Sequence, residues 1–537
     1  MRVAQVLRLA APALLLSSLV LLPFLNKAFT IDDPVFLFEA QHALTDPLHP
    51  TAFEMTWYAN PERLSAIVPT GPLMAWLLAP SVLAGGAEWL AHAIQLAMFW
   101  IAIAATVSLS LKLGLSPTCA VASGLLLSSM PAVLAMTGTA MPDTPAMALG
   151  VAGLDRLVAW RDDQRRCDGV MAAILLGAAP LARSHLVLLL GVGALFTVGD
   201  LFSAAAWLRG AWMRWLPLAG ALVITAGISA ATQDPSPKAL TVAGIALRLA
   251  SLEMLPSNTV AFAAHWVLAL AFALPWFVLR WRALLARFWV VVLTTGVAAI
   301  LLREFHGEMA PYFIAPIAGL GAAAVADAIA VALRHHDAVG LTLAAWLLLP
   351  LSTVVYVHLP PKYLLASAPA AAILIARRVS QHPRLGKVVV AVTVAAGVAG
   401  GIAILRADEA FAGAARAATE LLIRPRVLAG KSVWYAGHWG FQWYAERAGA
   451  RCLSATPPFP RVGDIIVSSA ASNPFIDVWS NSNLGHLGTW ADIHPGGRIM
   501  SRDAGAGFYS NDWGYLPWSW GSEPVDTFDA WIVNPPP

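Results

Sequence analysis

Two adjacent carboxylates, Asp32 and Asp33, directly follow the first long apolar run of the chain. A third carboxylate, Asp143, stands at the start of a later apolar run. A carboxylate beside a dry interface can have its pKa raised toward neutral pH, which would let it act as a general base. An acid at such a position can equally cap the helix that follows it or lie in solvent. For each acid taken alone, both interpretations stay open.

Basic side chains occupy comparable positions between apolar runs. Arg183 lies in Ala182-Arg-Ser-His, and Lys362 lies in Leu359-Pro-Pro-Lys-Tyr. A lone Lys or Arg at a membrane boundary usually extends to water or to lipid headgroups. Several on the same face as the acids could instead neutralise a phosphate group. We therefore predict a phosphate site of Arg183, Lys362 and Tyr363, with supporting roles for His185, Arg303, Glu304 and His306.

The composition predicts that these residues are positioned by membrane helices. Of the 537 residues, 58% are hydrophobic and 12% are charged, whereas about one quarter of a soluble domain is charged. Apolar runs near the roughly 20 residues needed to cross a bilayer recur along the chain. We expect a mostly α-helical polytopic protein of about 13 transmembrane helices, at 7–29, 88–111, 116–136, 143–159, 170–182, 185–205, 215–232, 259–279, 288–302, 310–333, 339–357, 363–379 and 388–405.

The distribution of Lys and Arg predicts the orientation of these helices. Most of the basic residues between the predicted spans fall in alternate connecting segments, such as the one that carries Arg161, Arg165 and Arg166. Short loops rich in Lys and Arg stay on the cytoplasmic side. The N-terminus is then inside and the C-terminal tail outside. The candidate acids and bases all fall on the outer face.

Three outer regions are larger than simple turns. Within the transmembrane domain of residues 1–405, segment 31–83 mixes charged and aromatic residues, which predicts amphipathic helices on the outer surface. Segment 233–258 has a similar pattern. After residue 405 the composition changes, and the order strand, helix, strand over 431–468 predicts a small extracytoplasmic α/β domain at 406–537. Segment 513–537, rich in Trp and Pro, is expected to be irregular.

Several classes of function are disfavoured by the sequence. The net charge is only +3 and the basic residues are scattered, so nothing indicates nucleic-acid binding. The chain has no P-loop, no His-Glu-x-x-His pair, no Gly-x-Ser-x-Gly elbow and no kinase motifs. A group transfer on the outer face, where nucleotides are absent, would need an activated donor that the membrane itself carries.

Five stretches resemble motifs of a known family. They are Asp32-Asp-Pro-Val-Phe-Leu-Phe-Glu-Ala, Pro69-Thr-Gly-Pro-Leu-Met-Ala-Trp, Met141-Pro-Asp-Thr-Pro-Ala-Met-Ala-Leu, Pro360-Pro-Lys-Tyr-Leu-Leu and His438-Trp-Gly-Phe-Gln-Trp-Tyr-Ala-Glu-Arg-Ala-Gly. In this order they resemble the C-type glycosyltransferases that use polyprenyl-phosphate sugars, including protein O-mannosyltransferases and lipid A aminoarabinose transferases. The resemblance implies a bacterial inner-membrane enzyme with its active site on the outer face.

The resemblance also implies roles for the candidate residues. A polyprenyl-phosphate sugar would be the donor, and a glycan, lipid or protein hydroxyl would be the acceptor. Asp32 would be the general base or would orient the acceptor. Asp33 and Asp143 would shape the site or hold a divalent cation, and Arg183 and Lys362 would neutralise the leaving phosphate.

Two other functions fit a chain with many spans and a few charges. A transporter or lipid flippase is the main alternative, but the sequence has no internal repeat of the kind that transporters carry, and the acids lie at one surface. A non-catalytic membrane scaffold is the other, and it would require the acidic pair to be only a helix cap.

Overall fold

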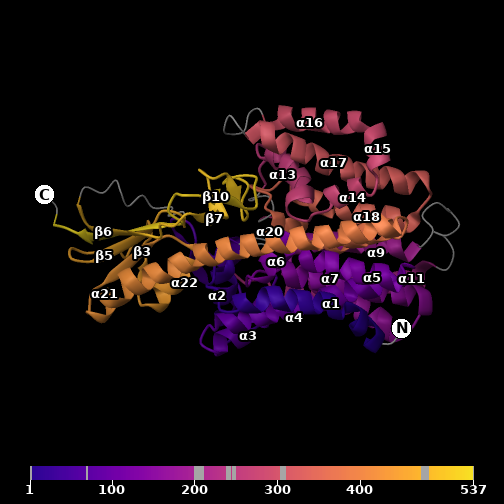
Figure 1. Ribbon diagram of the computed structural model, residues 1–537. Coiled ribbons are helices and arrows are strands. Elements are labelled where there is room, and N and C mark those ends of the chain that lie inside the picture. The colour runs from indigo at the N-terminus through magenta and orange to yellow at the C-terminus, as the bar shows by residue number, and fades with distance from the viewer. Residues whose placement is uncertain are drawn as a thin grey trace.

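Apolar helices make up most of the structure, and a small sheet lies at one end (Figure 1). The computed structural model describes residues 3–67, 71–198, 211–236, 244, 250–302, 310–472 and 483–535. Within these residues, five helices are long and apolar enough to cross a bilayer, or six if one bent pair counts as a single span. The chain is thus a polytopic helical membrane protein, as predicted. The number of about 13 spans stays a prediction.

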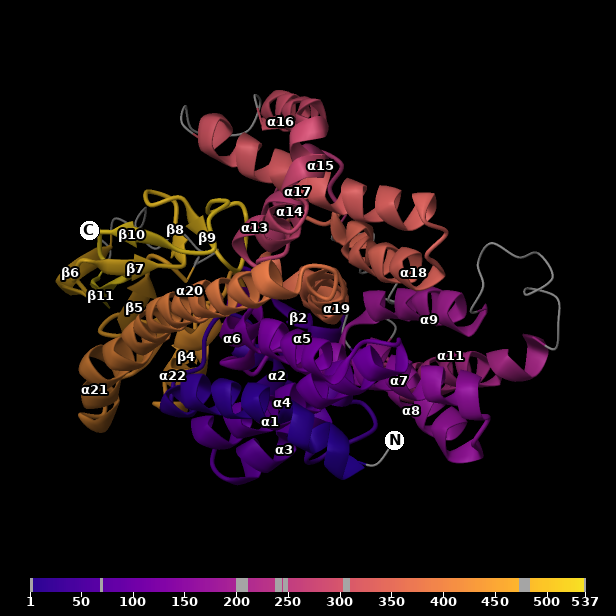
Figure 2. The same ribbon diagram turned by 45° about the vertical axis from the view of Figure 1, so that its right-hand side comes forward.

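The N-terminal helices form one packed group. In this group α4 lies against α7, α7 against α8, and α8 against α11, as Figure 2 shows. The group consists of α1 (Val3–Leu21), α4 (Glu88–Lys112), α5 (Pro117–Ser129), α6 (Pro131–Thr137), α7 (Asp143–Asp163), α8 (Arg166–Ala182), α9 (Leu189–Val198) and α11 (Ala211–Ala231).

A second group of helices packs around α17 and is set apart from the first, with α19 and α20 between the two groups (Figure 2). Its members are α13 (Leu255–Leu268), α14 (Ala273–Val278), α15 (Trp281–Ala286), α16 (Phe288–Leu302), α17 (Ala310–Arg334) and α18 (Ala338–Leu347). The intervening helices are α19 (Ala368–Val379) and α20 (Pro383–Ala418).

Local sequence signals explain where several helices begin and bend. Ser116 accepts a hydrogen bond from the Cys119 N–H and caps α5, whose first residue is proline, the residue favoured at that position. A second proline, Pro131, interrupts the apolar run, and the chain bends by 62° between α5 and α6, because proline cannot donate a helical hydrogen bond. Asp337 caps α18 by accepting from the Gly340 N–H at 2.9 Å.

Helix α20 connects the bundle to the C-terminal sheet. It has 36 residues, which corresponds to roughly 54 Å at 1.5 Å per residue, and it runs along the bundle toward the sheet (Figure 1). Gly397 and Gly401 allow it to lie close to the first group, since a Cβ at Gly397 would come within 2.3 Å of the Ser129 carbonyl oxygen. The helix continues without a break through the domain boundary predicted at residue 405.

Segment 31–83 contains two helices, as predicted, and also a short hairpin. The helices are α2 (Asp33–Ala43) and α3 (Leu73–Leu83), and the hairpin pairs β1 (Glu54–Thr56) with β2 (Pro61–Arg63). Helix α2 is buried along most of its length, because it packs against both α3 and α22 (Trp439–Arg447). It therefore lacks the exposed polar face expected of a helix lying on a membrane surface. Residues 237–243 and 245–249 of the similar segment 233–258 lie outside the described residues.

The C-terminal region forms a five-stranded mixed sheet, and the predicted strand, helix, strand order is confirmed. Strand β3 (Val433–Ala436) pairs in parallel with β4 (Arg451–Cys452) and β5 (Ile465–Ser469), and α22 follows β3. The strand order is β4-β3-β5-β11-β6, where β6 is Leu484–Ala491 and β11 is Thr527–Val533. Two-stranded sheets pair β7 (Gly496–Arg498) with β10 (Ser519–Gly521) and β8 (Met500–Ser501) with β9 (Ala506–Gly507).

The prediction of an irregular segment 513–537 is wrong. Strand β11 (Thr527–Val533) lies inside the five-stranded sheet, antiparallel to both β5 and β6 (Leu484–Ala491). Its sequence, Thr-Phe-Asp-Ala-Trp-Ile-Val, is rich in the β-branched and aromatic residues that fit a sheet. The Trp and Pro residues on either side concealed this short strand signal.

Candidate active site

The predicted acids do not act as simple helix caps. Asp32 occupies the N-cap position of α2, yet its side chain makes no capping hydrogen bond. Its Oδ2 instead accepts a hydrogen bond from Lys362 Nζ at 2.7 Å, across 330 residues of sequence. Asp143 lies in the first turn of α7 and likewise bonds a distant base. The helix-cap interpretation therefore does not account for these two acids.

The Asp32–Lys362 pair is partly accessible on its acidic side. The Asp32 side chain is 29% exposed, whereas that of Lys362 is 4% exposed. Burial raises the pKa of Asp32, but the Lys362 ammonium, with Arg183 adding to its effect, outweighs burial and leaves the pKa below its usual value. The sequence-based expectation of a raised pKa is therefore wrong for Asp32. At neutral pH this carboxylate is charged and paired.

The Asp143–Arg183 pair forms the second half of the site. Arg183 Nε donates to Asp143 Oδ1 at 3.1 Å, and Nη2 donates to Oδ2 at 2.8 Å. This two-point geometry is the strong form of an Arg–carboxylate contact. The Arg183 Cζ lies 5.6 Å from the centroid of the Tyr363 ring, and Lys362 Nζ lies 6.0 Å from the same centroid. The two ion pairs thus meet at Tyr363.

Aromatic and imidazole rings surround Tyr363. Ring centroids lie 6.1 Å away for His185, 6.1 Å for Tyr356 and 6.4 Å for His358. Burial lowers the pKa of His185 to about 3 and that of His358 to about 4, and nearby positive charges lower both further. Both rings are therefore neutral at pH 7, and the positive charge of the site resides on Arg183 and Lys362.

Asp33 holds the segment after α1 in place and does not face the site. Its side chain is fully buried, Oδ2 accepts from the Thr30 N–H at 2.9 Å, and Oδ1 accepts from the Ala140 N–H at 2.8 Å. It thereby ties the segment after α1 to the segment before α7. Burial raises the pKa of Asp33 to about 7, although Lys27 and both N–H donors favour its charged form. This geometry fits a positioning role better than a catalytic one.

A buried network that sequence reasoning missed lies beside this loop. Lys27 Nζ donates to Asp408 Oδ2 at 2.6 Å, and both side chains are 0% exposed. Tyr509 Oη donates to the same oxygen at 3.0 Å, and its ring centroid lies 6.0 Å from Lys362 Nζ. The available signal was a charge at each end of the apolar region, Lys27 at the end of the first run and Asp408 after the last.

The C-terminal region supports the loop that carries Asp32. Tyr444 on α22 accepts a hydrogen bond from the Phe29 N–H at 2.8 Å. A Cβ at Gly440 would come within 2.2 Å of the Phe29 carbonyl oxygen, so only glycine permits this approach. Trp443 packs edge-on against Phe29, with ring centroids 5.9 Å apart. The sheet and its helix α22 therefore help to fix the geometry of the site.

The predicted residues divide into two sets. The structure brings together Asp32, Asp33, Asp143, Arg183, His185, Lys362 and Tyr363. Arg303, Glu304 and His306 lie outside the described residues, and their supporting role stays a prediction.

The three acids do not fit a preformed divalent-cation site. Such a site needs several oxygen ligands that are not already used, whereas Asp143 is held by Arg183, Asp33 is held by backbone N–H groups, and Asp32 is paired with Lys362. Across the described part of the chain, no three His, Cys, Asp or Glu side chains are grouped closely enough to ligate a metal.

Comparison with known proteins gives matches only among solved structures. No protein-family model and no curated protein matches the chain. The structure is similar to that of ArnT from Cupriavidus metallidurans bound to undecaprenyl phosphate, at 13% identity and a TM-score of 0.46, over 88% of this chain and 94% of that one. It is also similar to the oligosaccharyltransferase of Archaeoglobus fulgidus, at 13% identity and a TM-score of 0.44, over 84% of this chain.

The chain spans 64% of the length of that oligosaccharyltransferase. A third similar structure is the arabinofuranosyltransferase AftD from Mycobacteria, at 12% identity and a TM-score of 0.45, over 100% of this chain and 42% of that one. At such identities the likeness concerns the arrangement of helices, so the reaction has to be inferred from the geometry of the site.

Proposed function

We propose that this protein transfers a sugar from a polyprenyl-phosphate donor to an acceptor hydroxyl. The observation that carries the proposal is the convergence of two acid–base pairs, Asp32–Lys362 and Asp143–Arg183, on the ring of Tyr363. Two fixed cations beside a partly accessible carboxylate provide what displacement of a lipid phosphate requires: neutralisation of the leaving group and orientation of the attacking hydroxyl.

The reaction is a displacement at the anomeric carbon. The acceptor oxygen forms a bond to this carbon while the bond from the carbon to the phosphate oxygen breaks, and the electron pair leaves on the phosphate. Lys362 and Arg183 stabilise the added negative charge on that phosphate. The acceptor proton passes to Asp32 or, if Asp32 only orients the hydroxyl, to solvent. No nucleotide is consumed.

The low pKa of Asp32 in the free protein gives the donor a further part in the reaction. A carboxylate that is paired with Lys362 is a weak base. When the donor phosphate attracts Lys362, that stabilisation of the Asp32 carboxylate weakens and its pKa rises toward the range useful for catalysis. Donor binding therefore prepares the base in the same step that positions the leaving group.

Membrane location and partners follow from this proposal. The site would face the outer side of a bacterial inner membrane, with the N-terminus inside and residues 406–537 outside, as the distribution of basic residues predicts. The donor would enter from the lipid phase. The acceptor belongs to the class of glycans, lipids or proteins that bear a free hydroxyl.

A transporter or flippase would require a site that opens alternately to both faces. The described charges of the site instead meet at one end of the helices and are held in place by the C-terminal region.

The decisive experiment reconstitutes the full chain in liposomes with a polyprenyl-phosphate sugar and an acceptor extract from the cell envelope. Release of polyprenyl phosphate together with a glycosylated product supports transfer. Movement of intact donor between leaflets, without release, contradicts it.

A further inference from the structure

A cavity lies at the opposite end of the bundle from the candidate active site. Helix α19 begins just after Tyr363 and ends beside this cavity, and α4 ends at Lys112, immediately before it. The 12 residues of α19 span roughly 18 Å, so the cavity lies at the far end of this helix from Tyr363. On the predicted orientation, the cavity faces the cytoplasmic side. It has a volume of about 410 Å³.

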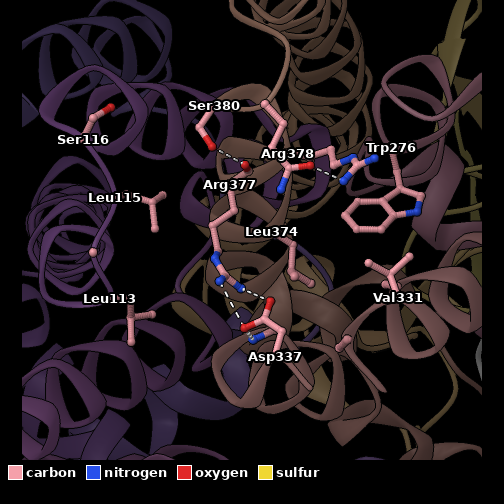
Figure 3. A pocket seen from close by; sticks show the side chains of 15 residues that line it. Leu113, Leu115, Ser116, Trp276, Val331, Asp337, Leu374, Arg377, Arg378 and Ser380 are labelled. Atoms are coloured by element: carbon pink, nitrogen blue, oxygen red, sulfur yellow. Dashed lines mark hydrogen bonds and ion pairs between the residues drawn. The ribbon is translucent and has the colours of Figure 1, made fainter. Parts of the chain in front are cut away.

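The lining combines apolar walls with a basic end (Figure 3). Leu113 and Leu115, from the connection between α4 and α5, lie on one side, and Trp276 and Val331 lie on the other. The end of α19 contributes the arginines 377 and 378. Such a lining suits a molecule with an apolar chain and a charged head.

The two arginines differ in their partners. Arg377 donates to both carboxylate oxygens of Asp337, at 2.9 and 3.1 Å, so this pair carries no net charge. Arg378 donates to the side-chain oxygen of Gln381 and, among the described residues, has no carboxylate within ion-pair distance. Its buried Nε has no hydrogen-bond partner in the described part of the chain. A buried donor without an acceptor is costly.

The carboxylate nearest to Arg378 already forms ion pairs with other arginines. Asp327 accepts hydrogen bonds from both Arg280 and Arg287. Around this end of the bundle, four arginines therefore face two aspartates, which leaves an excess of positive charge. An anion at Arg378 would balance part of that excess and would satisfy the unused guanidinium donors.

We propose that this cavity binds a phosphate group through Arg378, with an anionic phospholipid as its source. Guanidinium groups match phosphate geometry through several parallel N–H bonds, and basic pockets between membrane helices on the cytoplasmic side hold phospholipid headgroups. The leucine walls accommodate the start of an acyl chain, which a free phosphate would leave unfilled. This site is independent of sugar transfer at the other end of the bundle.

The test uses the full chain in detergent and native mass spectrometry. Short-chain phosphatidylglycerol should bind more tightly than phosphatidylcholine. Arg378→Ala should weaken phosphatidylglycerol binding about fivefold, the effect expected of one basic residue, and Arg378→Lys should restore part of it. The matched control is Arg282→Ala, because Arg282 is exposed, stacks on Trp281 and does not line the cavity. That control should change binding little.

A second arm distinguishes the source of the phosphate. Inorganic phosphate at millimolar concentration should compete weakly with phosphatidylglycerol in the wild-type protein. If phosphate alone binds tightly and Arg378→Ala abolishes its binding, the phosphate site stands and its ligand is a free anion. If Arg378→Ala leaves both ligands unaffected, or if phosphatidylcholine binds as well as phosphatidylglycerol, the proposal is wrong. Arg378→Gln replaces Arg378→Ala if the alanine variant does not fold.

Discussion

The candidate active site and the buried network beside it both contain ion pairs between an aspartate and a basic residue, but these pairs differ in their exposure to solvent. Asp32 is 29% exposed in its pair with Lys362, and Arg183 is 13% exposed in its pair with Asp143. Lys27 and Asp408 are both 0% exposed. The exposed members can exchange partners with a substrate. The buried pair can only be broken, which leaves an uncompensated charge away from water.

The difference in exposure separates residues that contact the substrate from residues that hold the site in position. Asp32 and Lys362 come from segments far apart in the chain and meet at the surface of the site. Lys27 and Asp408 join the first apolar run to α20 and, through Tyr509, to the C-terminal region. Substitutions in the first set should change transfer, and substitutions in the second should change stability.

The largest effect is expected from Asp32→Asn. The amide keeps the volume of the side chain but removes the charge and the base, so transfer should fall by roughly 10²–10⁴-fold. Initial rates of polyprenyl phosphate release measure this loss. The control is Glu409→Gln, an acid-to-amide change at a half-buried residue whose ion-pair partner within the described residues is Arg406. Near-normal transfer by Asp32→Asn would move the catalytic role to another acid.

Loss of a cation should have the next largest effect. Lys362→Ala should lower transfer by roughly 10²–10³-fold, because one of two groups that stabilise the leaving phosphate is removed. Lys362→Arg should be milder, since the charge is kept while the geometry changes. Steady-state kinetics with donor and acceptor varied separately should place the loss on the donor side. An equal loss for both substrates would indicate a role in folding.

The buried pair should affect stability instead. Asp408→Asn removes the carboxylate that pairs with the buried Lys27, which should cost about 3 kcal/mol. The midpoint of thermal unfolding of the detergent-solubilised protein should fall accordingly, while the protein that remains folded keeps its affinity for polyprenyl phosphate. An unchanged midpoint, or a selective loss of donor affinity, would place this pair in the site.

The smallest effect is a pH dependence that comes from His438. This ring is 4% exposed, and burial lowers its pKa to about 3, although the charge of Asp32 favours protonation. Because the folded-state pKa lies below the unfolded value of about 6.5, stability is complete above pH 6.5 and falls as the pH decreases toward 3. The loss at pH 5 should be about 1–2 kcal/mol. His438→Gln should reduce the slope of the stability profile over this pH range, to which His185 and His358 also contribute, and an unaltered slope would exclude His438 as one of its sources.

The sequence predicted the helices well because apolar runs and prolines mark them directly. The predicted span 88–111 corresponds to Glu88–Lys112, and segment 31–83, predicted to contain helices, holds Asp33–Ala43 and Leu73–Leu83. Strand β11 was missed because its seven residues carry a weak pattern between tryptophans and prolines.

Long-range pairing was the part that the sequence could not provide. Asp32 and Lys362 were both predicted as site residues, but only their separation of 2.7 Å reveals that the base lowers the pKa of the acid. Lys27 and Asp408 are 381 positions apart, and each alone resembles an ordinary charge at the end of a span. No local pattern indicates that such residues meet.

Binding of polyprenyl phosphate to Asp32→Asn and Lys362→Ala tests the central claim most directly. We propose that the donor phosphate replaces Asp32 as the partner of Lys362. Because Asp32→Asn frees the Lys362 ammonium, this variant should then bind polyprenyl phosphate more tightly than the wild-type protein does. Lys362→Ala should bind it more weakly. Opposite changes in Kd, with unchanged unfolding midpoints, are the predicted result. A similar loss of affinity in both variants would show that the pair is structural and would contradict the proposed exchange.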